Sequence, residues 1–222
     1  PRFLRAKSTL ESIARDTISG YFHCVSIIPD RERLPMYSAE MRYALGDYRA
    51  VELFHDHARR APTQDPLALV QYIDVKTYLP GDILVKVDRA SMAHSLEVRC
   101  PFLDYTLVEW SAGLSTDLKM RGAEGKCVLK KSMEGVLSDD ILYRPKMGFG
   151  VPVSQWFRGP LRKLLREQVL GRGMVDTGLF SPQALERLVD QHQSGRRDHS
   201  AALWALLMFS ASMQRLGVTG SA

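Results

Sequence analysis

Apolar residues recur with a helical period along most of the chain, and residues typical of helix ends divide that pattern into separate helices. A capping box at Ser8–Glu11 predicts a first helix over about residues 9–19, with Gly20 as its stop. The last expected helix should reach Leu216, and its apolar middle, ALWALLMFSA, predicts burial on all sides. Further helices are expected after residues that can cap a helix N-terminus, which are Asp65, Asp82, Asp104, Ser181 and Asp198. The pattern as a whole predicts a mainly α fold.

Strand patterns are scarce, because few stretches alternate between apolar and polar residues. Short extended pieces are expected at most at residues 22–28 and 98–100. Loops are expected where prolines, glycines and polar residues gather, at 29–35, 61–66 and 144–153. A glycine-containing segment at 159–178 is a candidate joint between two parts of the chain, although no clear domain boundary is visible.

The stretch between Tyr78 and Asp104 combines a helix stop, a helix start and many charged residues. Leu79-Pro80-Gly81 predicts the end of the helix that starts after Asp65, and Asp82 the start of the next one. On that next helix Asp82, Lys86 and Arg89 share one stripe, at spacings i, i+4 and i+7. Spacing alone favours a solvated ion-pair stripe over a ligand site. The following Glu97 and Arg99 are expected to form a buried structural ion pair before the PFLD loop.

The composition is that of an ordinary globular protein, with 45% apolar and 25% charged residues among 222. The net charge of +5 suits an anionic ligand such as a nucleotide or pyrophosphate. It falls short of the dense basic face of a nucleic-acid-binding protein, so we expect no nucleic-acid partner. The basic residues gather on and around a helix expected over about residues 125–137, as Lys119, Arg121, Lys126, Lys130, Lys131, Arg144 and Lys146.

The three cysteines, Cys24, Cys100 and Cys127, are far apart and form no C-x-x-C pair. Neither a disulfide framework nor a zinc site is indicated, and the histidines offer no metal-ligand spacing, so we expect no protein-built metal site. A reducing, cytoplasmic setting fits this cysteine usage best. No apolar run approaches the ~18 residues of a membrane-spanning helix, so no membrane partner is expected.

Three blocks of the sequence resemble, in the same order, the synthetase domain of the glutamine-dependent asparagine synthetases. They are YLPGDILVKVDRASMAHSLEVRCPFLD at 78–104, LKMRGAEGKCVLKKSMEGVL at 118–137 and RPKMGFGVPVSQWFRG at 144–159. Departures from the family pattern are small. Cys100 stands where the family often has valine, and Cys127 where it often has an aromatic residue.

The resemblance implies that residues 1–222 are the helical C-terminal portion of an adenine-nucleotide α-hydrolase-like (ATP pyrophosphatase) α/β domain, whose parallel sheet lies upstream. The family binds ATP through an SGGxDS loop, whose backbone N–H groups surround phosphate. Neither that loop nor the N-terminal cysteine of the family's glutaminase occurs in this sequence. Both would lie upstream, so we expect one truncated domain of a longer enzyme.

The function implied by the resemblance is that of an ATP-dependent amidoligase. Such an enzyme makes asparagine from aspartate and glutamine-derived ammonia through an acyl-adenylate, and it releases AMP and pyrophosphate. The full-length enzyme would use ATP and Mg²⁺, neither of which is expected to bind tightly to this chain alone. The upstream glutaminase domain is the expected protein partner, together with a second copy in a homodimer.

The resemblance also assigns residues to the site. Lys126 stands at the position of the family's catalytic lysine, near a helix start that is preceded by glycine. The residues that would face the nucleotide and the acyl substrate are Lys86, Asp88 and Arg89, and those of a basic loop over pyrophosphate are Arg144 and Lys146. Two alternatives stay open: a related amidotransferase or β-lactam synthetase-like enzyme that acts on another carboxylate, and a non-catalytic helical binding module.

Overall fold

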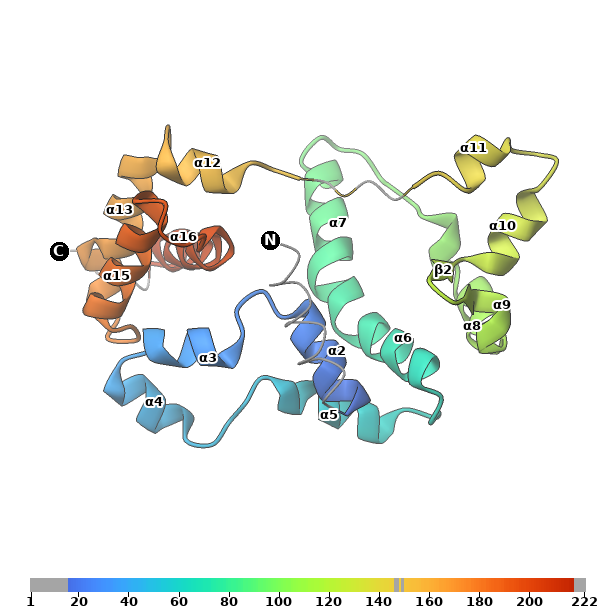
Figure 1. The fold of residues 1–222 in the computed structure, drawn as a ribbon, viewed down its shortest axis with the longest axis horizontal. Coiled ribbons are helices and arrows are strands. Elements are labelled where there is room, and N and C mark those ends of the chain that lie inside the picture. Colours follow the sequence, from blue (N-terminus) through green and yellow to red (C-terminus); the bar gives the residue numbers. More distant parts are fainter. Residues whose placement is uncertain (1–15, 146–147, 149, 218–222) are drawn as a thin grey trace. The chain divides into compact units, whose positions relative to one another are not determined.

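A computed structural model describes residues 16–145, 148 and 150–217. The described chain is mainly helical and divides into two compact units (Figure 1). Unit 1 comprises residues 1–21 and 51–148, and unit 2 comprises residues 22–50 and 149–222. Helix α2 (Thr17–Val25) runs across the first division between them. The segment 159–178, expected as a joint, lies within unit 2 instead and forms helices there.

Unit 2 is a bundle of helices around one hydrophobic core. Its elements are α3 (Asp30–Arg33), η1 (Leu34–Met36), α4 (Ala39–Leu45), α12 (Val153–Arg158), α13 (Arg162–Leu170), α14 (Arg172–Val175), α15 (Pro182–Gln193) and α16 (Ser200–Arg215). Phe157 is fully buried at the centre, where its ring lies 6.3 Å from that of Trp204. The other buried members of the core are Met36, Leu165, Val169, Met174, Leu185, Val189, Leu203, Leu206 and Leu207.

The early segment of unit 2 is joined to the late one by backbone hydrogen bonds. The Ser38 N–H donates to the Leu179 carbonyl at 3.0 Å, and the Ser181 N–H donates to the Met36 carbonyl at 2.8 Å. An ion pair between Arg197 and Glu32, 2.7 Å long, adds a contact between side chains. The unit is thus built from segments that lie far apart in the sequence.

Helix α16 is buried on one side only. Leu203, Leu206 and Ser210 are buried, whereas Trp204 and Met208 are 41% and 42% exposed. The expectation that the apolar middle of this helix is buried on all sides was therefore wrong. Unit 2 covers one face of the helix and leaves the other open.

Unit 1 has much less buried apolar surface. Its elements after α2 are α5 (Val51–Arg60), α6 (Pro66–Lys76), η2 (Leu79–Leu84), α7 (Val85–Met92), η3 (Pro101–Leu103), α8 (Tyr105–Ala112), α9 (Thr116–Lys119), β1 (Met120–Arg121), β2 (Glu124–Gly125), α10 (Cys127–Met133) and α11 (Asp139–Leu142). Among its described residues, Ile18 and Ile73 are the large apolar side chains that are buried. Polar contacts supplement them: the Thr116 hydroxyl donates to Asp65, and the Lys119 ammonium donates to Gln71.

Most expected helix caps are confirmed. The Asp65 carboxylate accepts a hydrogen bond from the Ala68 N–H at 2.8 Å, and this bond lowers the pKa of Asp65. Asp104 accepts from the N–H groups of Thr106 and Leu107, and Ser181 accepts from the Ala184 N–H. The expected cap of the last helix at Asp198 was wrong: Asp198 accepts from the Ser200 N–H at 2.9 Å, but the N-cap of α16 is His199. Each bond satisfies a backbone donor that a helix start would otherwise leave free.

The expected stop at Pro80 and the cap at Asp82 were wrong. Helix α6 already ends at Lys76, and residues Leu79–Leu84 form a π-helical turn, η2, that leads directly into α7. Asp82 lies inside that turn, where its side chain caps no helix. A π-turn contains one more residue than an α-helical turn, so one backbone N–H in it can go without a helical hydrogen bond. Pro80 has no N–H and therefore fits in such a turn.

Three expectations near the start of the chain also need correction. The helix expected over 9–19 lies almost wholly outside the described residues, but Gly20 does not stop a helix, because it is buried within α2. Residues 22–25 belong to that helix, so the extended piece expected at 22–28 was wrong. The loop expected at 29–35 is helical, since Pro29 serves as the N-cap of α3 and Pro35 lies at the start of η1, positions that tolerate proline.

The described strands are the two short ones of a hairpin. In β1 and β2, Met120 pairs with Gly125 and Arg121 with Glu124 in antiparallel register. Helix α10 is shorter than the expected 125–137 and begins just after this hairpin. Residues 98–100 form no strand, although Cys100 has extended backbone angles.

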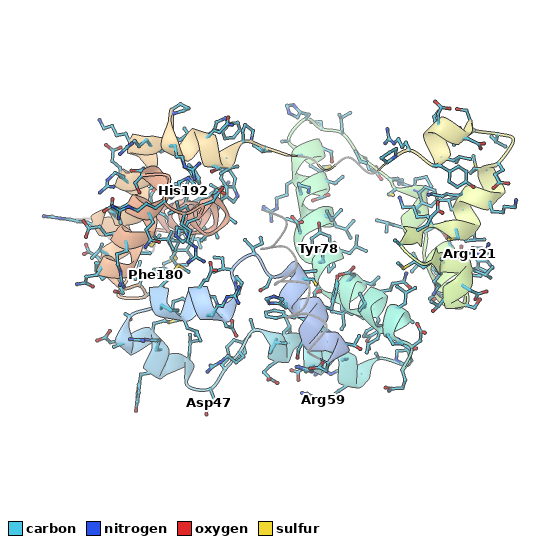
Figure 2. All side chains as sticks on the ribbon, in the orientation of Figure 1. Asp47, Arg59, Tyr78, Arg121, Phe180 and His192 are labelled. Atoms are coloured by element: carbon cyan, nitrogen blue, oxygen red, sulfur yellow. The ribbon has the colours of Figure 1, made fainter. Side chains whose placement is uncertain are left out.

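Two histidines are built into unit 2 as neutral groups. His192, labelled in Figure 2, is fully buried, and its Nδ1 accepts a hydrogen bond from the His199 N–H at 3.1 Å. Its Nε2 lies 3.2 Å from the Ser154 carbonyl, so Nε2 carries the proton. Burial lowers the pKa of both His192 and His199, and the positive charge of Arg158 further lowers that of His192.

We expect unit 2 to lose stability as the pH falls through about 6.5, the ordinary pKa of histidine. The unfolded chain binds protons at these histidines in that range and the folded unit does not, so acid favours unfolding. Urea unfolding followed by tryptophan fluorescence at pH 7.5 and pH 5.5 would measure the difference. His94→Gln removes an exposed histidine of unit 1 and should leave the difference unchanged. Equal stability at both pH values would contradict the prediction.

We also expect the isolated chain to bind a hydrophobic dye or to self-associate through unit 1. Large apolar side chains are exposed from α7 to α8, at Met92, Leu96, Val98, Phe102, Tyr105 and Trp110. Phe102→Ser should reduce dye binding without lowering stability, because the ring is 62% exposed. Tyr43→Ser, at an exposed position of unit 2, is the matched control. A strict monomer without dye binding in light scattering and fluorescence would refute the idea.

Candidate functional site

Helix α7 presents Lys86, Asp88 and Arg89 to solvent. All three are exposed, and none of their side chains forms a hydrogen bond or ion pair with another described residue. The ion-pair stripe that spacing favoured is therefore absent from the described structure. These side chains are available to a ligand, but no described bond connects them with the other expected site residues.

Lys126 has an unusual backbone. Its angles, φ 64° and ψ 32°, are left-handed, and it is the N-cap of α10 rather than the first residue inside the helix. Few residues other than glycine adopt this conformation, which is costly and tends to persist where the surroundings enforce it. Gly122, with φ 58°, turns the hairpin that leads into it. Lys126 is thus held at a sharp junction between β2 and α10.

The structure separates the run of basic residues into two groups. Lys119 donates to the Ala112 carbonyl at 3.0 Å, Lys130 pairs with Glu124 at 2.6 Å, and Lys131 pairs with Glu134 at 2.6 Å. No such bond from a described residue reaches the exposed side chains of Lys126 or Arg144. Among the described residues of this run, Lys126 and Arg144 are the predicted site positions whose positive charge has no described partner.

Tyr143 connects these two positions through α10. Its hydroxyl donates to Glu134 at 2.8 Å, and this hydrogen bond raises the pKa of Tyr143. The Lys130 ammonium lies 5.0 Å from the centre of its ring, within the range of a cation–π contact. Arg144 follows Tyr143 directly, so its backbone lies next to a residue that is bonded to Glu134, the C-cap of α10, while Lys126 is the N-cap of the same helix. Lys146, the other predicted residue of this loop, lies outside the described residues.

Glu97 and Arg99 form the expected ion pair, with 2.6 Å between oxygen and nitrogen. The expected burial was wrong, because the two side chains are 70% and 87% exposed. An exposed pair contributes little to stability. In the described structure nothing covers this part of unit 1.

The described residues contain neither a cluster of metal ligands nor a membrane-spanning helix. No three histidine, cysteine or acidic side chains gather there in a way that could hold a metal ion. Magnesium that accompanies a nucleotide is usually held by phosphates, water and one or two carboxylates, so Asp88 could contribute without such a cluster. None of the described helices is long and apolar enough to cross a membrane.

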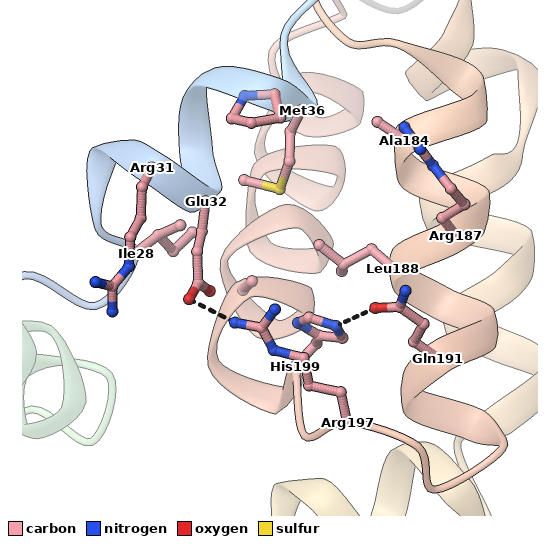
Figure 3. Close-up of a pocket in the computed structure, with 12 residues that line it drawn as sticks. Ile28, Arg31, Glu32, Met36, Ala184, Arg187, Leu188, Gln191, Arg197 and His199 are labelled. Carbon is pink, nitrogen blue, oxygen red and sulfur yellow. Dashed lines mark hydrogen bonds and ion pairs between the residues drawn. The ribbon is translucent and has the colours of Figure 1, made fainter. Parts of the chain in front are cut away.

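A pocket of about 320 Å³ lies in unit 2, where sequence reasoning indicated no site (Figure 3). Its polar groups are largely paired with one another: Arg197 with Glu32, and His199 with Gln191 at 2.9 Å. Figure 3 shows the side chains of Arg31 and Arg187 pointing away from each other. The groups do not converge on a ligand position, so the predicted residues of unit 1 remain the candidate site.

Comparison with known proteins connects this site to a family. A protein from Mycobacterium bovis, named among the glutamine-hydrolysing asparagine synthetases, is 39% identical over 65% of this chain and 22% of its own length. Asparagine synthetase 1 of Bacillus subtilis is 26% identical over 94% of the chain and 32% of its own length. Amidase chry2 of Gibberella zeae is 32% identical over 56% of the chain and 20% of its own length. No solved structure gives a match.

The chain spans about a fifth to a third of the length of these curated relatives. The model of the asparagine synthase family matches residues 7–214, which include every predicted site residue. A match of that extent, together with three sequence blocks in the same order, shows that the chain belongs to the asparagine synthase family.

Proposed function

We propose that this chain is the C-terminal portion of the synthetase domain of a longer ligase, which uses ATP to make asparagine from aspartate and ammonia. The ammonia would come from glutamine, hydrolysed in an upstream glutaminase domain. The relatives support this reading, since their names state asparagine synthesis with glutamine hydrolysis and they are three or more times longer than the matched segment. A cytoplasmic location and a homodimer belong to the same proposal.

The proposal rests mainly on one observation. Lys126 carries an ammonium without a described partner, and a left-handed N-cap between a hairpin and a helix fixes its backbone. A non-glycine residue held in the left-handed region costs about 1–3 kcal/mol, and such residues cluster at active sites and ligand clamps. A catalytic lysine needs this combination of a fixed backbone and a free side chain.

The proposed chemistry places negative charge where Lys126 can stabilise it. The aspartate side-chain carboxylate attacks the α-phosphorus of ATP, pyrophosphate leaves, and an acyl-adenylate forms. Ammonia then attacks the acyl carbon and AMP leaves. Charge grows first on the phosphoryl oxygens and then on the acyl oxygen, and a preorganised cation lowers the free energy of both transition states.

The remaining site residues would bind the substrates. Lys86 and Arg89 supply cations for phosphate or carboxylate, and Asp88 supplies a carboxylate for Mg²⁺-bound water or for an ammonium group. Arg144 would contact the leaving pyrophosphate, and Lys146 is proposed for the same role. The exposed state of the described residues among them is compatible with ligand contact.

The exposed apolar side chains of unit 1 support the proposed domain architecture. In an ATP pyrophosphatase-like α/β domain, helices pack on both faces of a parallel sheet. Residues between Leu96 and Trp110 would then be covered by the upstream sheet. The nucleotide loop SGGxDS would come from the same upstream region.

A second candidate function is amide chemistry on a different carboxylate. The amidases named among the relatives, chry2 and chyE, match 56% and 78% of this chain, so the shared segment occurs in proteins whose names do not state asparagine synthesis. Testing aspartate against other carboxylic acids in an ATP–pyrophosphate exchange assay would separate the two candidates.

We predict that the 222-residue chain alone catalyses neither glutamine hydrolysis nor ATP–pyrophosphate exchange. The nucleotide loop and the glutaminase cysteine do not occur in its sequence. Exchange of labelled pyrophosphate into ATP, measured with and without aspartate, would test this, with the full-length enzyme as the positive control. Aspartate-dependent exchange by the purified chain would overturn the prediction.

We predict that Lys126→Ala lowers synthetase turnover of the full-length enzyme by roughly 10²–10³, the effect of deleting one preorganised oxyanion donor. Glutaminase activity and the melting temperature should stay near wild type. Lys126→Gly should be equally inactive although it relieves the left-handed strain, which would assign the loss to the ammonium.

Lys163→Ala is the control, because it removes an exposed lysine of unit 2 with an i, i+4 partner. Lys130 is unsuitable, since its pairing with Glu124 and Tyr143 gives it a structural role. Near-normal asparagine formation by Lys126→Ala would refute the assignment of catalysis to this residue.

A further inference from the structure

Tyr143 is held in place by specific polar contacts rather than by apolar packing. Its side chain is 45% exposed, so apolar burial contributes little to its placement. Instead it makes two directed contacts, one with the C-cap of α10 and one with the helix itself: a 2.8 Å hydrogen bond from its hydroxyl to Glu134, and the 5.0 Å approach of Lys130 to its ring. By contrast, Tyr43, which is 91% exposed, has no described partner for its hydroxyl.

Lys130, which contacts the ring of Tyr143, also contacts Lys126 and the strand before it. Lys130 pairs with Glu124 at 2.6 Å, and Glu124 lies in β2, two residues before Lys126. The backbone N–H of Lys130 donates to the Lys126 carbonyl at 2.9 Å. Lys130 thus contacts both the Lys126 carbonyl and Glu124, and its ammonium also lies near the ring of Tyr143.

Lys131, also in α10, adds a further ion pair to the network. It pairs with the Glu134 carboxylate that accepts the Tyr143 hydroxyl. Hydrogen bonds from Lys131 and Tyr143 lower the pKa of Glu134, which therefore stays ionised and remains an acceptor at neutral pH. Glu134 thus holds the hydroxyl of Tyr143 in place through a charge-assisted bond.

We propose that Tyr143 is a positioning residue that fixes Arg144 relative to Lys126, so that one anchor sets the distance between the two cations. The inference rests on the proposed function in one respect: the two cations are taken to act on the same anionic substrate. Tyr143 itself touches no substrate. Its contribution is geometric, and misplacing a catalytic group by about 1 Å can cost up to 10²-fold in rate.

The test uses the full-length enzyme with Tyr143→Phe, which keeps the ring over Lys130 and removes the bond to Glu134. We expect synthetase kcat to fall by roughly tenfold, with little change in the KM for aspartate. Glutaminase activity and the melting temperature should be unchanged. Tyr43→Phe removes an equivalent hydroxyl from an exposed position of unit 2 and should have no effect.

A double variant shows whether Tyr143 acts through Lys126. If it does, adding Tyr143→Phe to Lys126→Ala should cost much less than the roughly tenfold loss expected in the wild-type background. Additive losses would overturn the proposal. So would a wild-type kcat for Tyr143→Phe, or a fall in melting temperature with equal losses of both activities, which would indicate a merely structural role.

Hydrogen exchange tests the positioning role of Tyr143 without depending on the reaction that the enzyme catalyses. The Lys130 amide, which donates to the Lys126 carbonyl, should exchange faster in Tyr143→Phe than in wild type and Tyr43→Phe. Unchanged exchange would overturn the positioning role. If wild-type enzyme formed no AMP with aspartate or other carboxylates, the proposed function would fail, and the exchange measurement would still decide whether Tyr143 fixes the start of α10.

Discussion

Burial of apolar surface is the constraint on which this structure depends, and the two units meet it unequally. Unit 2 encloses Phe157 and its neighbours between helices drawn from both ends of its sequence. Unit 1 buries few large apolar side chains and is held together mainly by caps, ion pairs and hydrogen bonds, such as those of Asp65 and Lys119. Since polar contacts at a surface contribute little net stability, the described residues of unit 1 give it less stabilisation than the core of unit 2 provides.

The local order of the candidate site arises from directed polar contacts. Around Lys126, the hairpin turn, the Glu124–Lys130 pair and the Tyr143–Glu134 bond fix the backbone on both sides of the residue. These contacts use Lys130 and Lys131, which belong to the basic run of the sequence around Lys126. The result is that Lys130 and Lys131 support the structure, while Lys126 keeps a side chain without a described partner.

Features of the fold that depend on neighbouring residues could be predicted from the sequence. Asp65, Asp104 and Ser181 cap helices as expected, because a cap involves only residues within one turn. Features that depend on distant packing could not. Gly20 is buried inside a helix, and Pro80 is accommodated by a π-turn, so the local preference of each residue was overruled.

The same limit applies to the site. Lys126 was found through a resemblance of sequence blocks, since nothing in its spacing separates it from Lys130. The left-handed backbone at Lys126 arises at the junction of β2 and α10, and the contact between Tyr143 and Glu134, nine residues apart, follows from the turn that joins α10 to α11. No periodic pattern records such a contact, because it lies between elements rather than within one.

The uneven burial also bears on how folding and chemistry are coupled. In the proposed enzyme, the upstream sheet that would cover the residues between Leu96 and Trp110 also carries the nucleotide loop. Docking of that sheet would then bury apolar surface on unit 1 and bring ATP to the cations of α7 and α10 in a single step. Unit 2 already buries a hydrophobic core around Phe157 among its own described residues. We therefore infer that substrate binding stabilises unit 1 selectively, since a ligand that binds only the docked state adds its binding free energy to that state.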